Sequence, residues 1–278
     1  PGPLEQQTPI FDFTPAQPAR PKERSFWLRG GIAGSRQTLC DPFGRFGTQC
    51  EHSTGPVGSF EIGNARVSLV VRDGNYRAPV EGQWTHMIVH GRYKKFGPAH
   101  LGITLEASMQ SWEHSVFTTG DTTLGTTRAT KVAFWGLSFG SSDHHRQHIR
   151  LSVMQGLWQS VYDGTLRVPQ FSGNVNLAHD ESRLRRVRLE TGNIPIGSRI
   201  LVSTSTQRTW VHLTESSSII SPVVPHVQWS STAQASVRAW SVHPRLHLEL
   251  TLDASLASNH PSLTDNRSVG IGLAWRFR

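Results

Sequence analysis

The chain has 278 residues and a net charge of +8, with 28 basic and 20 acidic side chains. This length is enough for one domain with a sizeable core or for two small domains. No stretch approaches the roughly 18 consecutive apolar residues of a membrane-spanning helix, which excludes insertion as helices. A strand of a membrane barrel needs only about 10 residues with every second one apolar, so insertion as strands stays open.

The basic residues are almost all arginine, since only four of the 28 are lysine (Lys22, Lys94, Lys95 and Lys131). A soluble surface usually carries many lysines, because a flexible ammonium group is easily solvated. Arginine is preferred where cations are confined and hydrogen-bonded, as on the inner wall of a barrel. The bias therefore supports an enclosed basic surface, although a GC-rich genome would have the same effect.

Residues 1–23 differ from the rest of the chain, because six of them are proline and they show no periodicity. This composition predicts an extended, polyproline-like or unstructured tail. The chain begins at Pro1 without an apolar leader, and we expect this to be a processed, mature terminus. Ile10, Phe11 and Phe13 form an apolar patch in the tail. Three interpretations of the patch stay open. The tail could be a leader without a specific role, a docking peptide for a periplasmic partner, or a segment that folds back into the lumen.

From residue 24 onward, apolar and polar residues alternate with a period of two almost everywhere. No helical pattern with caps is visible. The alternation predicts twelve strands, over residues 25–37, 57–73, 82–94, 98–114, 126–141, 146–162, 165–178, 183–193, 197–213, 224–241, 244–257 and 266–278. Ten or fourteen strands would also fit the pattern.

The predicted strands favour a membrane barrel over a sandwich. Regular alternation often persists for nine to eleven residues, longer than the usual soluble strand of about 5–6 residues. The polar face is rich in small residues, which suit a curved inner wall. Tryptophans near predicted strand ends indicate an aromatic girdle at the membrane–water boundary: Trp27, Trp84, Trp112, Trp210, Trp229 and Trp275. Residues 24–278 therefore predict an all-β, closed antiparallel, transmembrane up-and-down β-barrel.

The last predicted strand, Ser268–Arg278, alternates and carries Phe277 next to its end. It resembles the terminal strand of bacterial outer-membrane β-barrel proteins, a porin-like class, although Arg278 follows the aromatic residue that is usually last. The resemblance implies delivery to the barrel-assembly machinery and a place in the outer membrane, in contact with its lipid. An even number of strands would put both termini, and hence the tail, in the periplasm.

The connections give further expectations. Asp163-Gly164 predicts a tight periplasmic turn, and Ser241–Pro244 predicts another. Residues 38–56 would be the first external loop. Cys40 and Cys50 lie within it and would form a disulfide in an oxidising compartment, the alternative being two free thiols.

The chemistry available for catalysis is sparse. The His-x-Ser-Asn-Gly run of phospholipase barrels is absent. His179, Asp180, Glu181 and Ser182 have suitable side chains but crowd a short predicted loop, so a lipid-modifying barrel enzyme is only an alternative. Asp143–His148 has metal-binding residue types without a specific spacing, and an exposed loop is the preferred interpretation. We expect no cofactor, and no nucleic acid partner, because the arginines form no basic stripe with stacking aromatics.

The inner wall is then the place for function. Alternation predicts a lumen lined by Arg66, Arg72, Glu106, Arg150, Arg186, Arg188, Glu190, Arg238, His247, Glu249, Asp253 and Arg276. Acids and bases that pair across the lumen would plug it, whereas unpaired arginines along a watery path would favour anions.

The sequence thus predicts a non-enzymatic outer-membrane barrel. It would act as a narrow pore for small polar or anionic solutes, or as an outer-membrane anchor of an envelope assembly through residues 1–23. A soluble β-sandwich that binds carbohydrate is the other alternative, because its strands also have one apolar face.

Overall fold

A computed structural model describes residues 26–41, 49–64, 66–77, 80–96, 99–141, 148–196, 200–218, 227–243, 246–258 and 263–277. The regular elements in these ranges are strands: β1 (Phe26–Asp41), β2 (Gln49–Asn64), β3 (Val67–Tyr76), β4 (Val80–Phe96), β5 (Ala99–Thr119), β6 (Thr122–Ser141), β7 (His148–Val168), β8 (Phe171–Ile196), β9 (Ile200–Ser218), β10 (Val227–His243), β11 (Leu246–Ser258) and β12 (Leu263–Phe277). No helix long and apolar enough to cross a membrane occurs in the described ranges.

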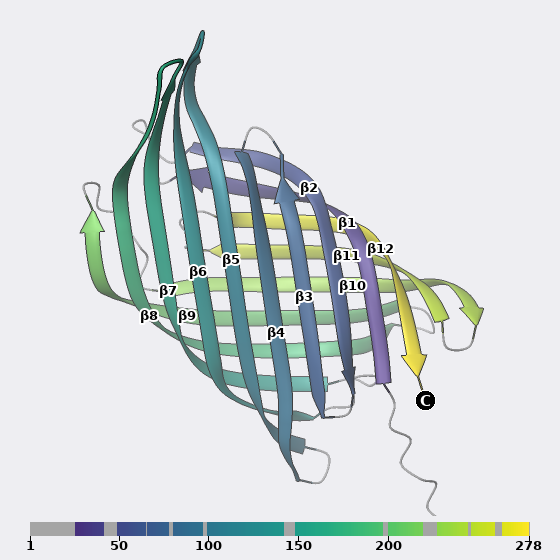
Figure 1. Cartoon of the computed structure of the whole chain (residues 1–278). Coiled ribbons are helices and arrows are strands. Elements are labelled where there is room, and N and C mark those ends of the chain that lie inside the picture. The colour runs from purple at the N-terminus through teal and green to yellow at the C-terminus, as the bar shows by residue number, and fades with distance from the viewer. Residues whose placement is uncertain are drawn as a thin grey trace, which may run out of the picture.

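Each strand pairs antiparallel with the strands before and after it in the chain. β12 pairs with β1 from Phe26 opposite Phe277 to Leu39 opposite Leu263, so the strand order closes on itself as a barrel (Figure 1). The predicted all-β, antiparallel up-and-down architecture is confirmed. The tail, residues 1–23, with its proposed docking residues Ile10, Phe11 and Phe13, lies outside the described residues.

One predicted strand, over residues 57–73, is wrong, because this stretch belongs to two strands. β2 ends at Asn64, whose side-chain oxygen accepts the backbone N–H groups of Arg66 (2.7 Å) and Val67 (3.0 Å). Such a side-chain acceptor mimics a backbone turn, and asparagine favours it. Gly63 and Asn64 together are a turn signal, but the period-two pattern of residues 65–71 continues directly after them, so alternation alone missed the turn. The predicted external loop is also too long, since β2 begins at Gln49.

For β7 and β8 the sequence analysis made the opposite error, because it predicted three strands where the structure has two. The predicted turn at Asp163-Gly164 is wrong, because these residues pair with Asn176 and Val175 inside the β7–β8 ladder. A register shift next to Asp163 lets the pairing continue. A bulge of this kind accommodates turn-forming residues within a strand. The chain instead turns at residues 169–170, and the two errors offset each other in the strand count.

The ladders β5–β6 and β7–β8 are the longest in the barrel. They rise as two tall hairpins beyond the rest of the wall, at the end away from the C-terminus (Figure 1). The connections at the terminal end are mostly short, as at residues 97–98 and 244–245, and the longest of them joins β6 to β7 over residues 142–147. The two ends of the barrel are therefore different.

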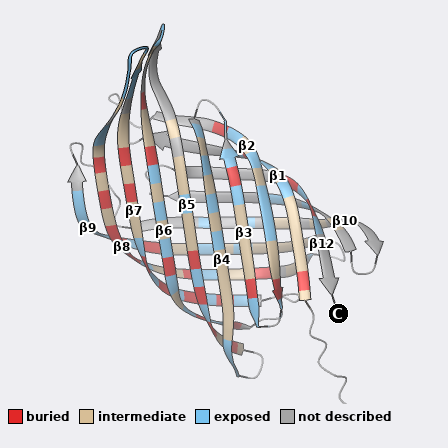
Figure 2. Cartoon of the chain, viewed as in Figure 1, coloured by how far each residue is buried: buried red, intermediate tan, exposed pale blue. Residues whose placement is uncertain are grey.

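Side chains alternate between a covered and an open face of the sheet. Along β7, Arg150 and Met154 are buried, whereas Ile149, Leu151 and Val153 are 51%, 44% and 57% exposed. Bands of buried and exposed residues repeat along the neighbouring strands (Figure 2). In the described part of the chain the outward apolar residues pack against no second sheet, so the sandwich alternative is wrong.

The inner face also holds a small apolar core. Phe134, Met154, Leu184 and Val211 come from β6, β7, β8 and β9 in turn, and they pack together. Glycines allow the strands to curve tightly around this core. At Gly136, for example, a Cβ atom would overlap the carbonyl oxygen of Val153 and lie 2.6 Å from the Cα atom of Met154.

The two cysteines occupy opposite positions in one ladder. Cys40 on β1 is the direct cross-strand partner of Cys50 on β2. Directly opposed residues in an antiparallel pair have Cα atoms about 4.5–5.5 Å apart, which suits a disulfide. Their side chains lie outside the described ones, so the disulfide stays a prediction.

We expect Gly136→Ala to lower the thermal stability of the folded barrel clearly, because the added methyl group meets the backbone of β7. The measurement is the temperature at which the compact, heat-modifiable gel band disappears. Gly34→Ala is the matched control, since a Cβ atom at Gly34 has nothing within 4 Å. Equal transition temperatures for the two variants would contradict the tight approach of β6 and β7.

Candidate functional site

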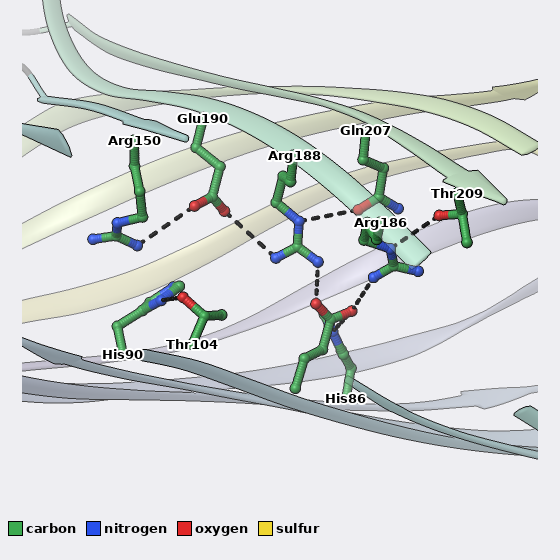
Figure 3. A network of polar contacts seen from close by, with 10 residues as sticks. His86, His90, Thr104, Arg150, Arg186, Arg188, Glu190, Gln207 and Thr209 are labelled. Carbon is green, nitrogen blue, oxygen red and sulfur yellow. Dashed lines mark hydrogen bonds and ion pairs between the residues drawn. The ribbon is translucent and has the colours of Figure 1, made fainter. Parts of the chain in front are cut away.

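The inner face of β8 presents a row of charged side chains. Arg186, Arg188 and Glu190 follow each other at a spacing of two, so all three point to the same side of the strand. Arg150 on β7 is the cross-strand partner of Glu190 and donates to it over 3.5 Å. Arg188 lies 3.7 Å from the other oxygen of Glu190. Arg150, Glu190 and Arg188 thus form a continuous ion-pair chain, and Arg186 lies next to Arg188 in the same row (Figure 3).

Glu106 reaches this row from β5, on the other side of β6 and β7. One carboxylate oxygen accepts Arg186 Nη1 (2.8 Å), and the other accepts Arg188 Nη2. His86 Nε2 on β4 lies 3.1 Å from the first oxygen. Glu106 is only 9% exposed, so one buried carboxylate links strands that are not neighbours in the barrel.

Three of the residues beneath this bridge are small, and they lie beside the larger Phe134 and Met154. Gly136, Ser138 and Ser152 occupy inward positions of β6 and β7 between Glu106 and the arginines. Ser138 and Ser152 are 3% and 0% exposed, as expected for a floor covered by longer side chains. Small residues on β6 and β7 therefore make room for the bridge to cross the inner wall.

Further contacts fix the orientation of the two central guanidinium groups. Arg186 Nε donates to Thr209 Oγ1, and Arg188 Nε donates to Gln207 Oε1, both over 3.0 Å. The Cζ atom of Arg186 also lies 3.5 Å from the centre of the Phe134 ring. Planar guanidinium groups suit such combined stacking and hydrogen bonding better than lysine does.

The charges in the network nearly cancel. Arg150, Arg186 and Arg188 face Glu106 and Glu190, so one positive charge remains when His86 is neutral. Removing ions from water is costly, and close ion pairing with several hydrogen bonds offsets that cost. The predicted arginine excess is thus largely paired on this wall. The described pairs join strands of one wall, β5 to β8, and none of them reaches the opposite wall of β12 and β1.

The structure describes the side chains of only two of the other predicted lumen residues, Arg72 and Arg66. Arg72 shares its side of β3 with Ser68, which is buried, whereas Arg66 lies in the β2–β3 turn and is exposed there rather than lining the wall. The backbone places Arg238 opposite Glu249. The side chains of the remaining predicted residues lie outside the described ones: Arg238, His247, Glu249, Asp253 and Arg276.

Two members of the predicted aromatic girdle are wrong. Trp27 is 6% exposed and donates from Nε1 to Glu61 inside the barrel (3.2 Å). Trp84 shares its side of β4 with His86, which faces Glu106. The position of a tryptophan near a strand end therefore does not show whether its side chain faces lipid or the lumen. The alternation of side chains along the strand determines that.

The remaining tryptophans give a mixed picture. Trp210 is outward and 37% exposed, as predicted, and Trp135 is an outward tryptophan that the sequence analysis did not select. The side chains of three other predicted girdle residues lie outside the described ones: Trp112, Trp229 and Trp275.

The candidate hydrolase site is not assembled. The residues lie in β8 and not in a loop, and Ser182 is buried inside while His179, three positions away, lies on the opposite face. His179 contacts Gln159 and Glu181 on that outer face instead. Residues 143–147 lie outside the described ones, and no group of three metal-ligating side chains occurs within the described ranges.

Sequence reasoning missed the histidines of the inner wall. His86 contacts Glu106, and His90 Nδ1 lies 3.0 Å from Thr104 Oγ1. Their spacing of four residues on a strand places both on one face, which was the available signal. Their partners are on another strand, and alternation does not identify cross-strand partners.

Comparison with known proteins bears on the fold. No family model matches the chain, and no curated protein matches it. Among solved structures, the translocator domain of the autotransporter NalP from Neisseria meningitidis is 10% identical, with a TM-score of 0.53, covering 93% of this chain and 90% of that one. The β domain of the Bordetella autotransporter BrkA is 11% identical, with a TM-score of 0.43, covering 91% and 99%. The likeness to the NalP translocator domain shows the fold alone, and this fold is that of a bacterial outer-membrane β-barrel, as the sequence predicted.

We expect Glu106→Gln to lower the free energy of unfolding by about 3 kcal/mol, because it leaves two buried arginines without their shared carboxylate. Urea titration of the barrel in detergent micelles, followed by tryptophan fluorescence, measures this loss. Glu181→Gln, which removes an exposed carboxylate from the outer face of β8, should change it by less than about 0.5 kcal/mol.

The same titration tests the pairing with Arg188. In the Glu106→Gln background, adding Arg188→Gln should cost less than it does in the wild-type protein, because the ion pair is already lost. Strictly additive losses would show that the two side chains do not stabilise each other.

Proposed function

We propose that the chain is an integral outer-membrane barrel. The observation that carries this proposal is the exposed apolar belt on its outer face. On β7 the belt runs from Ile149 to Leu157, both more than half exposed. Eight steps of about 3.3 Å along a strand tilted by about 40° give a height of roughly 20 Å, close to the apolar band of about 25 Å in such barrels.

The orientation that we propose places both termini, and the tail at residues 1–23, in the periplasm. The support is the asymmetry of the connections, since mostly short turns join the strands at the terminal end and the tall hairpins β5–β6 and β7–β8 rise at the other (Figure 1). Outer-membrane barrels combine short periplasmic turns with longer extracellular loops. Strand β12 would then be the segment that the barrel-assembly machinery receives.

For the lumen, we propose a narrow passage for small polar or anionic solutes. The ion-pair network covers the wall formed by β5–β8, and β12 and β1 lie opposite this wall in the ring of strands. The inward positions there include a run of small residues: Gly31, Ala33, Ser35, Gly270 and Gly272. Nearer the termini, the inward positions of β1 carry Trp27 and Arg29. Twelve strands about 4.8 Å apart and tilted by about 40° give a backbone radius on the order of 12 Å. Long side chains on one wall and the run of small residues on the other leave space beside the network.

The second candidate function is a non-conducting anchor that binds an envelope protein through residues 1–23. The observation that favours it is the same bridge from Glu106 to Arg186 and Arg188, because a cross-linked inner wall narrows any passage. Deleting residues 1–23 tests this candidate. Envelope proteins that co-purify with the full chain and are lost from the deletion variant would support it, and unchanged co-purification would exclude it.

Single-channel recording in planar bilayers tests the pore. The wild-type protein should give small, stable conductance steps. Glu106→Gln should raise the ratio of anion to cation permeability by at least about twofold, because Arg186 and Arg188 lose their neutralising carboxylate.

The control is Glu181→Gln, which removes the same charge from the outer face and should leave the permeability ratio unchanged. Vesicle flotation of the same preparations establishes insertion independently. Barrels that insert but show no steps, in the wild type and in the Glu106 variant alike, would rule out the pore.

A further inference from the structure

The outer face of β8 and β9 carries basic residues that the ion-pair network does not use. We call them the outer basic patch, formed by Arg183, Arg185, Arg208 and His212, together with the ring of Trp210. In the β8–β9 ladder, Arg183 pairs with His212 and Arg185 pairs with Trp210. The intervening residues, such as Leu184 and Val211, are buried inside the barrel, so the patch faces outward.

The patch lies where the apolar belt ends. On the outer face of β8, Leu189 (47% exposed) and Val187 precede Arg185 and Arg183 in the direction of the tall hairpins. On β7, Leu157 is the partner of Arg183 and is 54% exposed. Basic side chains thus follow directly on the lipophilic surface, at the height where lipid tails give way to headgroups.

Two arginines of the patch, Arg183 and Arg185, have no acidic partner among the described residues. Within the described part of the chain, the guanidinium groups of Arg183 and Arg185 make no ion pair or hydrogen bond. The next acids along this face are Glu181 and Glu215, which occupy opposite positions in the β8–β9 ladder. They lie farther from the apolar belt than Arg183 does. Glu181 is engaged by Gln159 Nε2 over 3.1 Å. Two guanidinium groups are therefore left to bind an external anion.

Trp210 adds a second interfacial element. Its ring lies on the outer face, and the Cζ atom of Arg208 sits 5.0 Å from the ring centre. An indole ring prefers the membrane–water boundary, and a cation stacked on the ring stays at the same depth. The arrangement therefore combines a ring at the boundary with guanidinium groups around it.

We propose that the outer basic patch binds the phosphate group of an anionic membrane lipid whose acyl chains lie along the belt of β7 and β8. A guanidinium fork donates two parallel hydrogen bonds to phosphate oxygens, and two such forks two positions apart on one strand can enclose one headgroup. The inference rests on the proposed membrane insertion, but it does not depend on conduction through the lumen.

The test uses the full chain reconstituted into phosphatidylcholine vesicles that contain a minority of phosphatidylglycerol. After gentle solubilisation, native mass spectrometry counts the lipids that each barrel retains. The wild type should retain phosphatidylglycerol over phosphatidylcholine by at least about tenfold relative to the vesicle mixture. The double variant Arg183→Gln/Arg185→Gln should lose most of this preference.

Lys95→Gln is the matched control, because it removes one exposed positive charge at the other end of the barrel and should keep the preference. Flotation with vesicles first establishes that each variant inserts, and a wild type that does not float would overturn the membrane proposal itself. Insertion with equal retention in the wild type and the double variant would overturn only the lipid site. Displacement of the retained lipid by inorganic phosphate would show that a free anion is the ligand and would overturn the lipid proposal.

Discussion

The fold depends on one geometric constraint: a strand in a closed antiparallel ladder sends successive side chains to opposite faces, while its backbone groups bond only to the two adjacent strands. Pairing of β12 with β1 leaves no free edge in the barrel. Because the backbone is satisfied within the sheet, the outer face is free to be apolar and the inner face is free to be charged. A strand edge left open in hydrocarbon would cost several kcal/mol for each unpaired group.

On the inner face, three arginines are largely removed from bulk water, and ion pairs with two glutamates stabilise them there. Glu106 forms ion pairs with both Arg186 and Arg188, and Glu190 forms ion pairs with Arg188 and Arg150. Each central arginine therefore has a carboxylate partner and a neutral acceptor, and Arg186 in addition lies over an aromatic ring. The apolar cluster around Phe134 lies beside these pairs and excludes water, which strengthens them. Polar and apolar parts of the interior thus support each other, and neither is a separate core.

Alternation along the chain predicted the antiparallel architecture and the inward face of β8 correctly, because both follow from parity within a strand. It failed where a local contact interrupts or extends a strand. The Asn64 side chain makes a turn inside an unbroken pattern, and a bulge at Asp163 continues the ladder through a dipeptide that favours turns. The girdle prediction for Trp27 failed for another reason: it used position near a strand end, whereas parity places Trp27 inside, against Glu61. The bridge from Glu106 to β8 joins residues about eighty positions apart, and no one-dimensional pattern contains that information.

In strand β8, a single register fixes both the inner ion-pair network and the outer basic patch. Its sequence from Arg183 to Arg188 sends two arginines outward and two inward, with Leu184 buried between them. A slip by one residue would exchange these faces, moving Arg186 and Arg188 onto the apolar belt and Arg183 and Arg185 into the lumen. The ion pairs to Glu106 oppose such a slip, because the carboxylate on β5 has a fixed position. The buried network therefore holds the outward arginines at the rim of the belt, where the proposed lipid site requires them to be.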